Sequence, residues 1–180
     1  MKLRASLYTL IASMAFTPLV SAQMSEGAGK PMLSPPTKAS VMLGGKEVSI
    51  KYNSPSVRGR KIFGGLQPYD QVWRTGANTA TTLKTDVALT MGTATVPAGT
   101  YTLFTLPSQG TWKLIINKQA GQWGTEYHQE QDLARIDMTK NTLPQSQEKM
   151  SISFEDTHGN STQLHVRWET TDVWVPVVAH

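Results

Sequence analysis

The densest group of residues that could bind a ligand lies in the segment 61–78, which carries three glycines and three aromatic residues. Within it, Arg74 and Asn78 flank a predicted turn at Thr75-Gly76. A planar guanidinium beside an amide, with backbone N–H groups freed by a glycine turn, can hold a carboxylate, a phosphate or a sugar hydroxyl. We therefore expect Arg74 and Asn78 to belong to a ligand-binding site.

The same segment also has a purely structural interpretation. Arg74 would then pair with Asp70 or Asp86 inside the protein. Gly76 would supply a backbone with positive φ, and Asn78 would satisfy backbone groups of the loop. The sequence leaves both interpretations open, because loops carry function but long loops also need internal ties. In both, Gly76 is a structural residue of the turn.

A second candidate lies in the irregular stretch 117–132, where Trp123-Gly124 is followed by Tyr127. Aromatic rings are amphipathic and form platforms for sugar rings when they are exposed, but in a β-sandwich they more often fill the core. Trp123 and Tyr127 are the aromatic residues best placed for exposure. We add both to the candidate ligand-binding residues.

The histidines give little indication of a metal site. His128 and Glu130 are two residues apart, with Glu126 before them, and would face one side of a strand. A site needs three or four converging ligands, which this spacing does not provide, so we predict no metal and no cofactor. The sequence also lacks serine nucleophile motifs, phosphate-binding glycine loops and paired catalytic carboxylates. We therefore predict no catalytic residue.

Several short sequence motifs of the chain are shared with a known family. They are Gly64-Gly65-Leu66, Pro68-Tyr69, the signature Val72-Trp73-Arg74-Thr75-Gly76-Ala77-Asn78, Ala80-Thr81-Thr82, the run 97–107, Trp112, Asn117 and Trp123-Gly124. Because of these motifs, the chain resembles the bacterial domain of unknown function 2911 over most of its length after residue 22. The resemblance implies an exported β protein. It assigns no activity and no residue role, because the family has none established.

The first 22 residues have the pattern of a signal peptide. Lys2 and Arg4 precede an uncharged, mostly apolar stretch, and Val20-Ser21-Ala22 supplies the small residues of a cleavage site. The apolar stretch is too short to span a bilayer. We expect cleavage after Ala22, export to the periplasm or out of the cell, and no stable membrane insertion of the mature chain.

The composition is that of a globular β protein. The 180-residue chain is 39% hydrophobic and only 17% charged, and it contains 22 threonines, whose β-branched side chains favour strands. Removing residues 1–22 leaves 15 basic and 13 acidic residues, a net charge of +2, with no basic cluster for a nucleic acid. With no cysteine, disulfides and thiolate chemistry are excluded.

Hydrophobic alternation predicts many short strands in a single domain over 39–180, after a flexible Gly-, Ser- and Pro-rich leader over 23–38. The strands are expected at 48–52, 81–85, 87–91, 101–106, 112–116, 134–138, 152–154, 164–168 and 173–178. Pro176 favours an edge position for the last of them. Since no segment makes a convincing helix of ten residues, we predict an all-β fold, a mostly antiparallel β-sandwich or jelly roll.

The sequence favours an exported protein that binds a small polar or anionic ligand, a glycan or an envelope partner without catalysing a reaction. Two alternatives stay open: a hydrolase-type enzyme with an Arg/Asn/His pocket, and a purely structural envelope component. An enzyme needs a titratable base beside Arg74 in a cleft, whereas a binding protein needs only hydrogen-bond donors and an aromatic wall.

Overall fold

The computed structural model describes residues 32–180. The predicted signal peptide, residues 1–22, and the part of the predicted leader up to residue 31 lie outside the described residues. In the described part, no helix is both long and apolar enough to cross a membrane.

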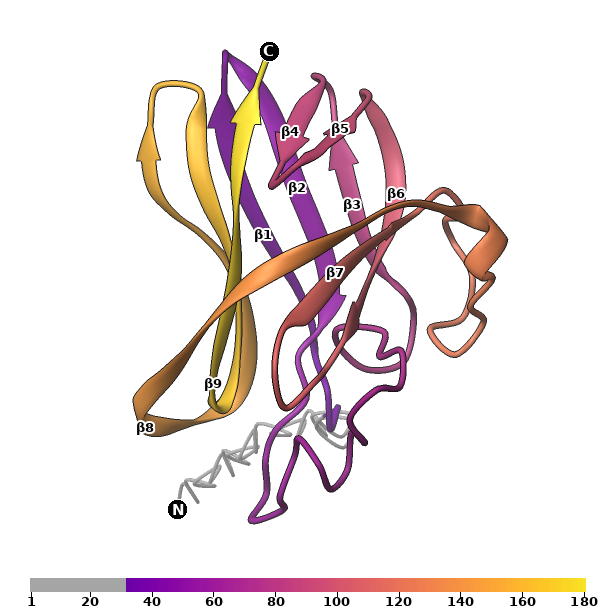
Figure 1. Cartoon of the computed structure of the whole chain (residues 1–180), viewed down its shortest axis with the longest axis vertical. Helices are drawn as coiled ribbons and strands as arrows, with labels where there is room; N and C mark the ends of the chain where they lie inside the picture. Colours follow the sequence, from indigo (N-terminus) through magenta and orange to yellow (C-terminus); the bar gives the residue numbers. More distant parts are fainter. Residues whose placement is uncertain (1–31) are drawn as a thin grey trace, which may run out of the picture. The chain divides into compact units, whose positions relative to one another are not determined.

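The described residues form nine strands, and every neighbouring pair of strands is antiparallel (Figure 1). The strands are β1 (Pro36–Leu43), β2 (Lys46–Asn53), β3 (Thr81–Thr85), β4 (Leu89–Met91), β5 (Ala94–Val96), β6 (Gly99–Leu106), β7 (Trp112–Asn117), β8 (Asp132–His158) and β9 (Ser161–Ala179). Their hydrogen-bonded order is β1-β2-β3-β6-β7-β8-β9-β4-β5, and one short 3-10 turn, Gln129–Gln131, precedes β8. The predicted all-β, mostly antiparallel fold is confirmed.

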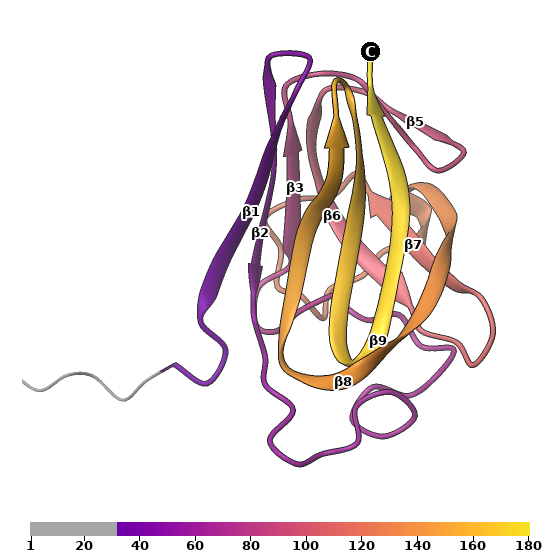
Figure 2. The same ribbon diagram turned by 90° about the vertical axis from the view of Figure 1, so that its left-hand side faces the viewer.

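The strands form two layers: one contains β1, β2, β3, β6 and β7, and the other contains β9, β4 and β5. The long strand β8 belongs to both layers. Its first part, up to Met138, pairs with β7, and from Thr139 onward it pairs with β9. Figure 2 shows β8 crossing from the side of β7 to lie beside β9. Register shifts between Thr142 and Ser151 interrupt the pairing of β8 with β9, and irregularities of this kind bend a strand.

The core lies between these layers and follows the alternation along the strands. Trp112, Leu114 and Ile116 of β7 are buried in the same cluster as Leu164 and Trp168 of β9. β7 lies between β6 and β8, and the intervening Ile115 is also fully buried on the opposite face of the strand.

The folded chain begins earlier than the sequence suggested. Strand β1 starts at Pro36, so the last three residues of the predicted leader belong to the sheet. Gly44 and Gly45, with φ of 56° and 73°, form the two-residue turn between Leu43 and Lys46. A Gly-Gly pair between two alternating segments is a hairpin signal, because both central positions of such a turn need positive φ.

The predicted edge position of the last strand is wrong. Strand β9 lies between β8 and β4. Its pairing with β4 ends at Met91, which stands opposite Val177. Pro176 stands one position beyond this pair, where its carbonyl accepts a 2.9 Å hydrogen bond from the Gly92 N–H. The proline is tolerated in an interior strand because the ladder to β4 has already ended.

Candidate functional site

The loop between β2 and β3, residues 54–80, carries much of the unusual backbone of the molecule (Figure 1). Six non-glycine residues of the described chain have positive φ, and four of them lie here: Arg58, Asp70, Thr75 and Asn78. Positive φ is least favourable for a β-branched residue, so Thr75, at 52°, is the most unusual of the four. Such strain persists only where other contacts enforce it, and it clusters at ligand sites.

The sheet holds the strained turn in place. Trp73 and Thr105 of β6 exchange two backbone hydrogen bonds, of 2.8 and 2.9 Å. Thr75 is fully buried, and its carbonyl accepts a 2.9 Å hydrogen bond from Oγ1 of Thr81 in β3. The indole Nε1 of Trp73 donates to the Gly76 carbonyl at 3.1 Å. These contacts fix the turn against β3 and β6.

Gly76 is required by close packing and not by its φ, which corrects the expectation from the sequence. The positive φ values of the turn fall at Thr75 and Asn78 and not at Gly76. A Cβ atom at Gly76 would stand 3.0 Å from Oγ1 of Thr81 and 3.1 Å from the carbonyl oxygen of Asn53. The turn approaches β2 and β3 too closely for a side chain at this position.

Arg74 is partly buried and has no carboxylate partner. Its Nη1 donates to the carbonyl oxygen of Asn78 at 3.0 Å. Among residues 32–180, no ion pair within 4.0 Å includes Arg74, and Asp86 pairs with Lys84 at 3.3 Å instead. The predicted internal pairing with Asp70 or Asp86 is therefore wrong. Burial lowers the pKa of Arg74.

Arg74 and Asn78 line one cavity of about 270 Å³, which we call the arginine pocket. The residues around it are Leu33, Ser34, Pro55, Ser56, Arg58, Arg60, Leu66, Gln67, Arg74, Gly76, Ala77, Asn78 and Trp168. No Asp, Glu or His stands among these lining residues. The pocket thus combines three guanidinium groups with amides and hydroxyls.

Arg58 and Arg60 were not predicted as site residues. Arg58 and Gly59, with φ of 51° and 67°, form the centre of a turn closed by the Arg60 N–H on the Val57 carbonyl. Such a turn favours Asn or Gly at the position of Arg58, so an arginine there is conformationally costly. Two arginines on either side of a glycine turn are the signal in the sequence that could have indicated a cationic site.

The guanidinium groups of Arg58 and Arg60 donate to backbone carbonyls. Arg58 Nη2 donates to the Leu33 carbonyl at 2.8 Å, and Arg60 Nε donates to the Val57 carbonyl at 2.9 Å. A carboxylate oxygen of Glu148 accepts from the Arg58 backbone N–H at 3.0 Å, but in residues 32–180 no carboxylate lies within 4.0 Å of either guanidinium. The charge of the pocket is not neutralised by an ion pair.

Trp168 forms the aromatic wall of the arginine pocket. It is 2% exposed and lies 5.6 Å, centroid to centroid, from the nearly parallel ring of Trp73. Its indole Nε1 is buried and has no hydrogen-bond partner among the described residues. A buried donor without a partner is unusual in a folded protein.

Trp123 is placed away from the arginine pocket. Its side chain is 51% exposed and does not line that cavity. Its backbone pairs with Thr79 in an isolated antiparallel bridge, and the neighbouring Gly124 N–H donates to the Asn78 carbonyl at 3.2 Å. The structure therefore brings Trp123 beside the same loop but onto another surface.

Tyr127 is occupied by contacts within the fold. Its hydroxyl donates to Oδ2 of Asp132 at 2.6 Å and accepts from Nη2 of Arg135 at 2.5 Å, while its ring meets Phe104 edge-on at 4.9 Å. Burial, together with the Asp132 carboxylate, raises the pKa of Tyr127 to about 12. Tyr127 shares only a small cavity of about 150 Å³ with Arg74 and does not line the arginine pocket.

The histidine considered as a metal ligand lies on the surface. His128 Nδ1 stands 3.2 Å from Oε1 of Glu130, and both side chains are more than half exposed. Within residues 32–180, no group of three or more metal-ligating side chains converges.

The fold and this site define an antiparallel β-sandwich with an arginine-lined cavity on the strained loop between β2 and β3. The chain belongs to the family described as Protein of unknown function (DUF2911), whose model matches residues 34–177. This match confirms the resemblance predicted from the sequence. No curated protein and no solved structure matches the chain.

Proposed function

We propose that this protein is an exported, non-catalytic binding protein that holds a small anionic ligand in the arginine pocket. One observation carries the proposal: three arginines line a single cavity, hydrogen-bond to backbone carbonyls without a paired carboxylate, and have no acidic residue among their neighbours in the cavity wall. A charge that the fold does not neutralise is available to a ligand.

The hydrogen-bond inventory supports an oxyanion. Each guanidinium has five N–H donors, and Arg74 uses one of them on Asn78. The remaining donors suit carboxylate or phosphate oxygens, which accept in pairs from an arginine fork. A cavity of about 270 Å³ is at the small end for ligand sites, which favours a compact ion over a large metabolite.

The lining also supports binding without catalysis. A general base must be within hydrogen-bond reach of the group it deprotonates, and no Asp, Glu or His lines the arginine pocket. The export in this proposal rests on the sequence of residues 1–22 alone. Intact-mass analysis of the native product should give Gln23 as the first residue, and recovery of full-length cytoplasmic protein would contradict export.

Isothermal titration calorimetry of the mature protein tests the ligand, with phosphate, sulfate, succinate and citrate as separate probes. We expect at least one of them to bind with a Kd below about 1 mM, and the comparison of phosphate with citrate separates the two oxyanion classes. Arg74→Ala should weaken binding at least about tenfold. Arg74→Lys should restore part of it, since lysine keeps the charge but not the fork.

The control is Lys84→Gln, which removes a positive charge from an exposed pair with Asp86 outside the arginine pocket. It should leave the affinity unchanged. Equal weakening by Lys84→Gln and Arg74→Ala would show that only net charge matters. That result, or the failure of all four probes to bind, would overturn the proposal.

A further inference from the structure

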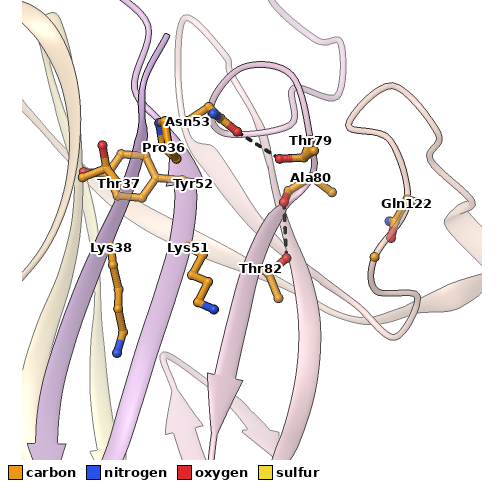
Figure 3. A pocket seen from close by; sticks show the side chains of 11 residues that line it. Pro36, Thr37, Lys38, Lys51, Tyr52, Asn53, Thr79, Ala80, Thr82 and Gln122 are labelled. Carbon is orange, nitrogen blue, oxygen red and sulfur yellow. Dashed lines mark hydrogen bonds between the residues drawn. The ribbon is translucent and has the colours of Figure 1, made fainter. Parts of the chain in front are cut away.

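A second cavity, of about 550 Å³, shares no lining residue with the arginine pocket. Lys38, Lys51 and Thr82 stand directly opposite one another across β1, β2 and β3 and form one side of it. Gln122, held by a 3.3 Å hydrogen bond from Oγ1 of Thr102 to its Oε1, lies on the opposite side (Figure 3). We call this cavity the sheet pocket.

The sheet pocket offers hydrogen-bond acceptors as well as donors. Oγ1 of Thr79 donates to Oδ1 of Asn53 at 2.9 Å, and Oγ1 of Thr82 donates to the Ala80 carbonyl at 3.3 Å (Figure 3). Both hydroxyls have therefore used their hydrogen inside the protein and present lone pairs to a ligand. The sheet pocket differs in this respect from the arginine pocket, whose three guanidinium groups are donors only.

The donors of the sheet pocket are an amide and an ammonium group. Nε2 of Gln122 is buried and has no hydrogen-bond partner among the described residues. Lys38 pairs with Glu47 at 2.5 Å, whereas Lys51 has no carboxylate within 4.0 Å in the described part of the chain. Sugar hydroxyls donate and accept at the same time, so they match a wall in which both kinds of group alternate.

Trp123 carries an exposed aromatic ring next in the chain to the sheet pocket, although it is not one of the residues that line the cavity. Trp123 follows Gln122 directly, and its antiparallel bridge places it opposite Thr79, so the two side chains project from the same face. Trp123 is 51% exposed, whereas Trp73, Trp112 and Trp168 are at most 3% exposed. An exposed indole beside a polar cavity is a platform for the apolar face of a sugar ring.

From these observations we propose that the sheet pocket binds a short saccharide, with one ring on Trp123 and its hydroxyls on Gln122, Lys51 and the threonine oxygens. An inorganic anion fits less well, because the lone pairs of Thr79 and Thr82 would face its charge. The proposal does not depend on the ligand of the arginine pocket.

Calorimetric titration of the mature protein with maltotriose, cellotriose and chitotriose tests this site. At least one trisaccharide should bind with a Kd below about 10 mM. Trp123→Ala removes an exposed ring and should weaken binding at least about tenfold. Gln122→Glu keeps the Oε1 acceptor for Thr102 and replaces the free donor by an oxygen, so it should weaken binding by a similar factor.

Arg60→Ala is the matched control, because Arg60 lines the arginine pocket, does not line the sheet pocket, and among the described residues donates only to the Val57 and Ser56 carbonyls. It should bind the trisaccharide as the wild type does, and circular dichroism should show the same fold for all three variants. Absence of binding by every trisaccharide, or unchanged affinity in Trp123→Ala, would overturn the saccharide site. Neither result would bear on anion binding at Arg74.

Discussion

Arginine is used in opposite ways on the outer face of β9 and in the loop between β2 and β3. Arg167 of β9 donates from both terminal nitrogens to the Glu155 carboxylate, and its Nε lies 3.3 Å from Oδ2 of Asp172. These contacts, led by the hydrogen bonds to Glu155, raise the pKa of Arg167. Arg74 donates only to a backbone carbonyl, and burial lowers its pKa.

The difference teaches that charge alone does not mark a binding site. The cluster on β9 also contains His165, whose Nδ1 lies 2.8 Å from Oδ1 of Asp172. The guanidinium of Arg167 already has two carboxylate partners there, Glu155 and Asp172. In the arginine pocket the counter-ion is missing, and for that reason we place the ligand in the loop and not on β9.

The largest effect on stability is expected for Arg167→Ala. The substitution leaves Glu155 and the almost fully buried Asp172 without their guanidinium partner. Removing one member of a buried ion pair is costly, and partial solvent access reduces the cost here, so we expect a loss of about 2–3 kcal/mol. Urea unfolding measures it. A loss under about 0.5 kcal/mol would show that the contacts of Arg167 with Glu155 and Asp172 do not stabilise the fold.

The elements of the sheet could be predicted from the sequence because one face of each strand is buried. The alternation at 48–52 and 81–85 and the apolar run 112–116 all correspond to observed strands. Strand β1 was missed because most of its residues are exposed and its apolar alternation is limited to Ala39, Val41 and Leu43. A second local signal is the turn at Gly44-Gly45.

The candidate site was predicted in part. Arg74 and Asn78 were identified by their residue types around a glycine turn, and they do line one cavity. Trp168 reaches the same cavity from β9, a distant part of the chain that a single sequence does not bring together with the loop. Tyr127 could not be assigned, because its hydroxyl partners depend on how the segment before β8 folds back.

A smaller loss is expected for Gly76→Ala, which perturbs the loop and leaves the β9 cluster intact. The new Cβ would stand 3.1 Å from the Asn53 carbonyl oxygen, a backbone atom that cannot move without shifting β2. We expect a destabilisation of about 1–2 kcal/mol and weaker anion binding, because the turn carrying Arg74 is displaced. Full anion affinity in this variant would show that the pocket does not need the strained turn.

Lowering the pH should remove the stabilisation that the β9 cluster gives through Glu155. Hydrogen bonds from Arg167 hold the pKa of Glu155 below its ordinary value, so the ionised carboxylate stabilises the fold at neutral pH. This contribution is lost as the pH falls through the lowered pKa, because the carboxylate must then be protonated. Glu155→Gln should cost about 1 kcal/mol at neutral pH and flatten the acid limb of the stability curve. An unchanged acid limb would contradict the assigned role of the pair.

The smallest effect on stability, and the most informative one, is expected for Arg74→Ala. The variant loses one hydrogen bond to the Asn78 carbonyl, which still accepts from the Gly124 N–H at 3.2 Å, and it relieves the burial of an unpaired charge. These terms oppose each other, so the change should stay under about 1 kcal/mol. A ligand that binds only the folded state raises the melting temperature with its concentration. Phosphate or citrate should therefore raise the Tm of the wild type and not that of Arg74→Ala. If Arg74→Ala instead unfolds many degrees lower and neither anion shifts the wild type, Arg74 is a structural tie, and the contrast with Arg167 disappears.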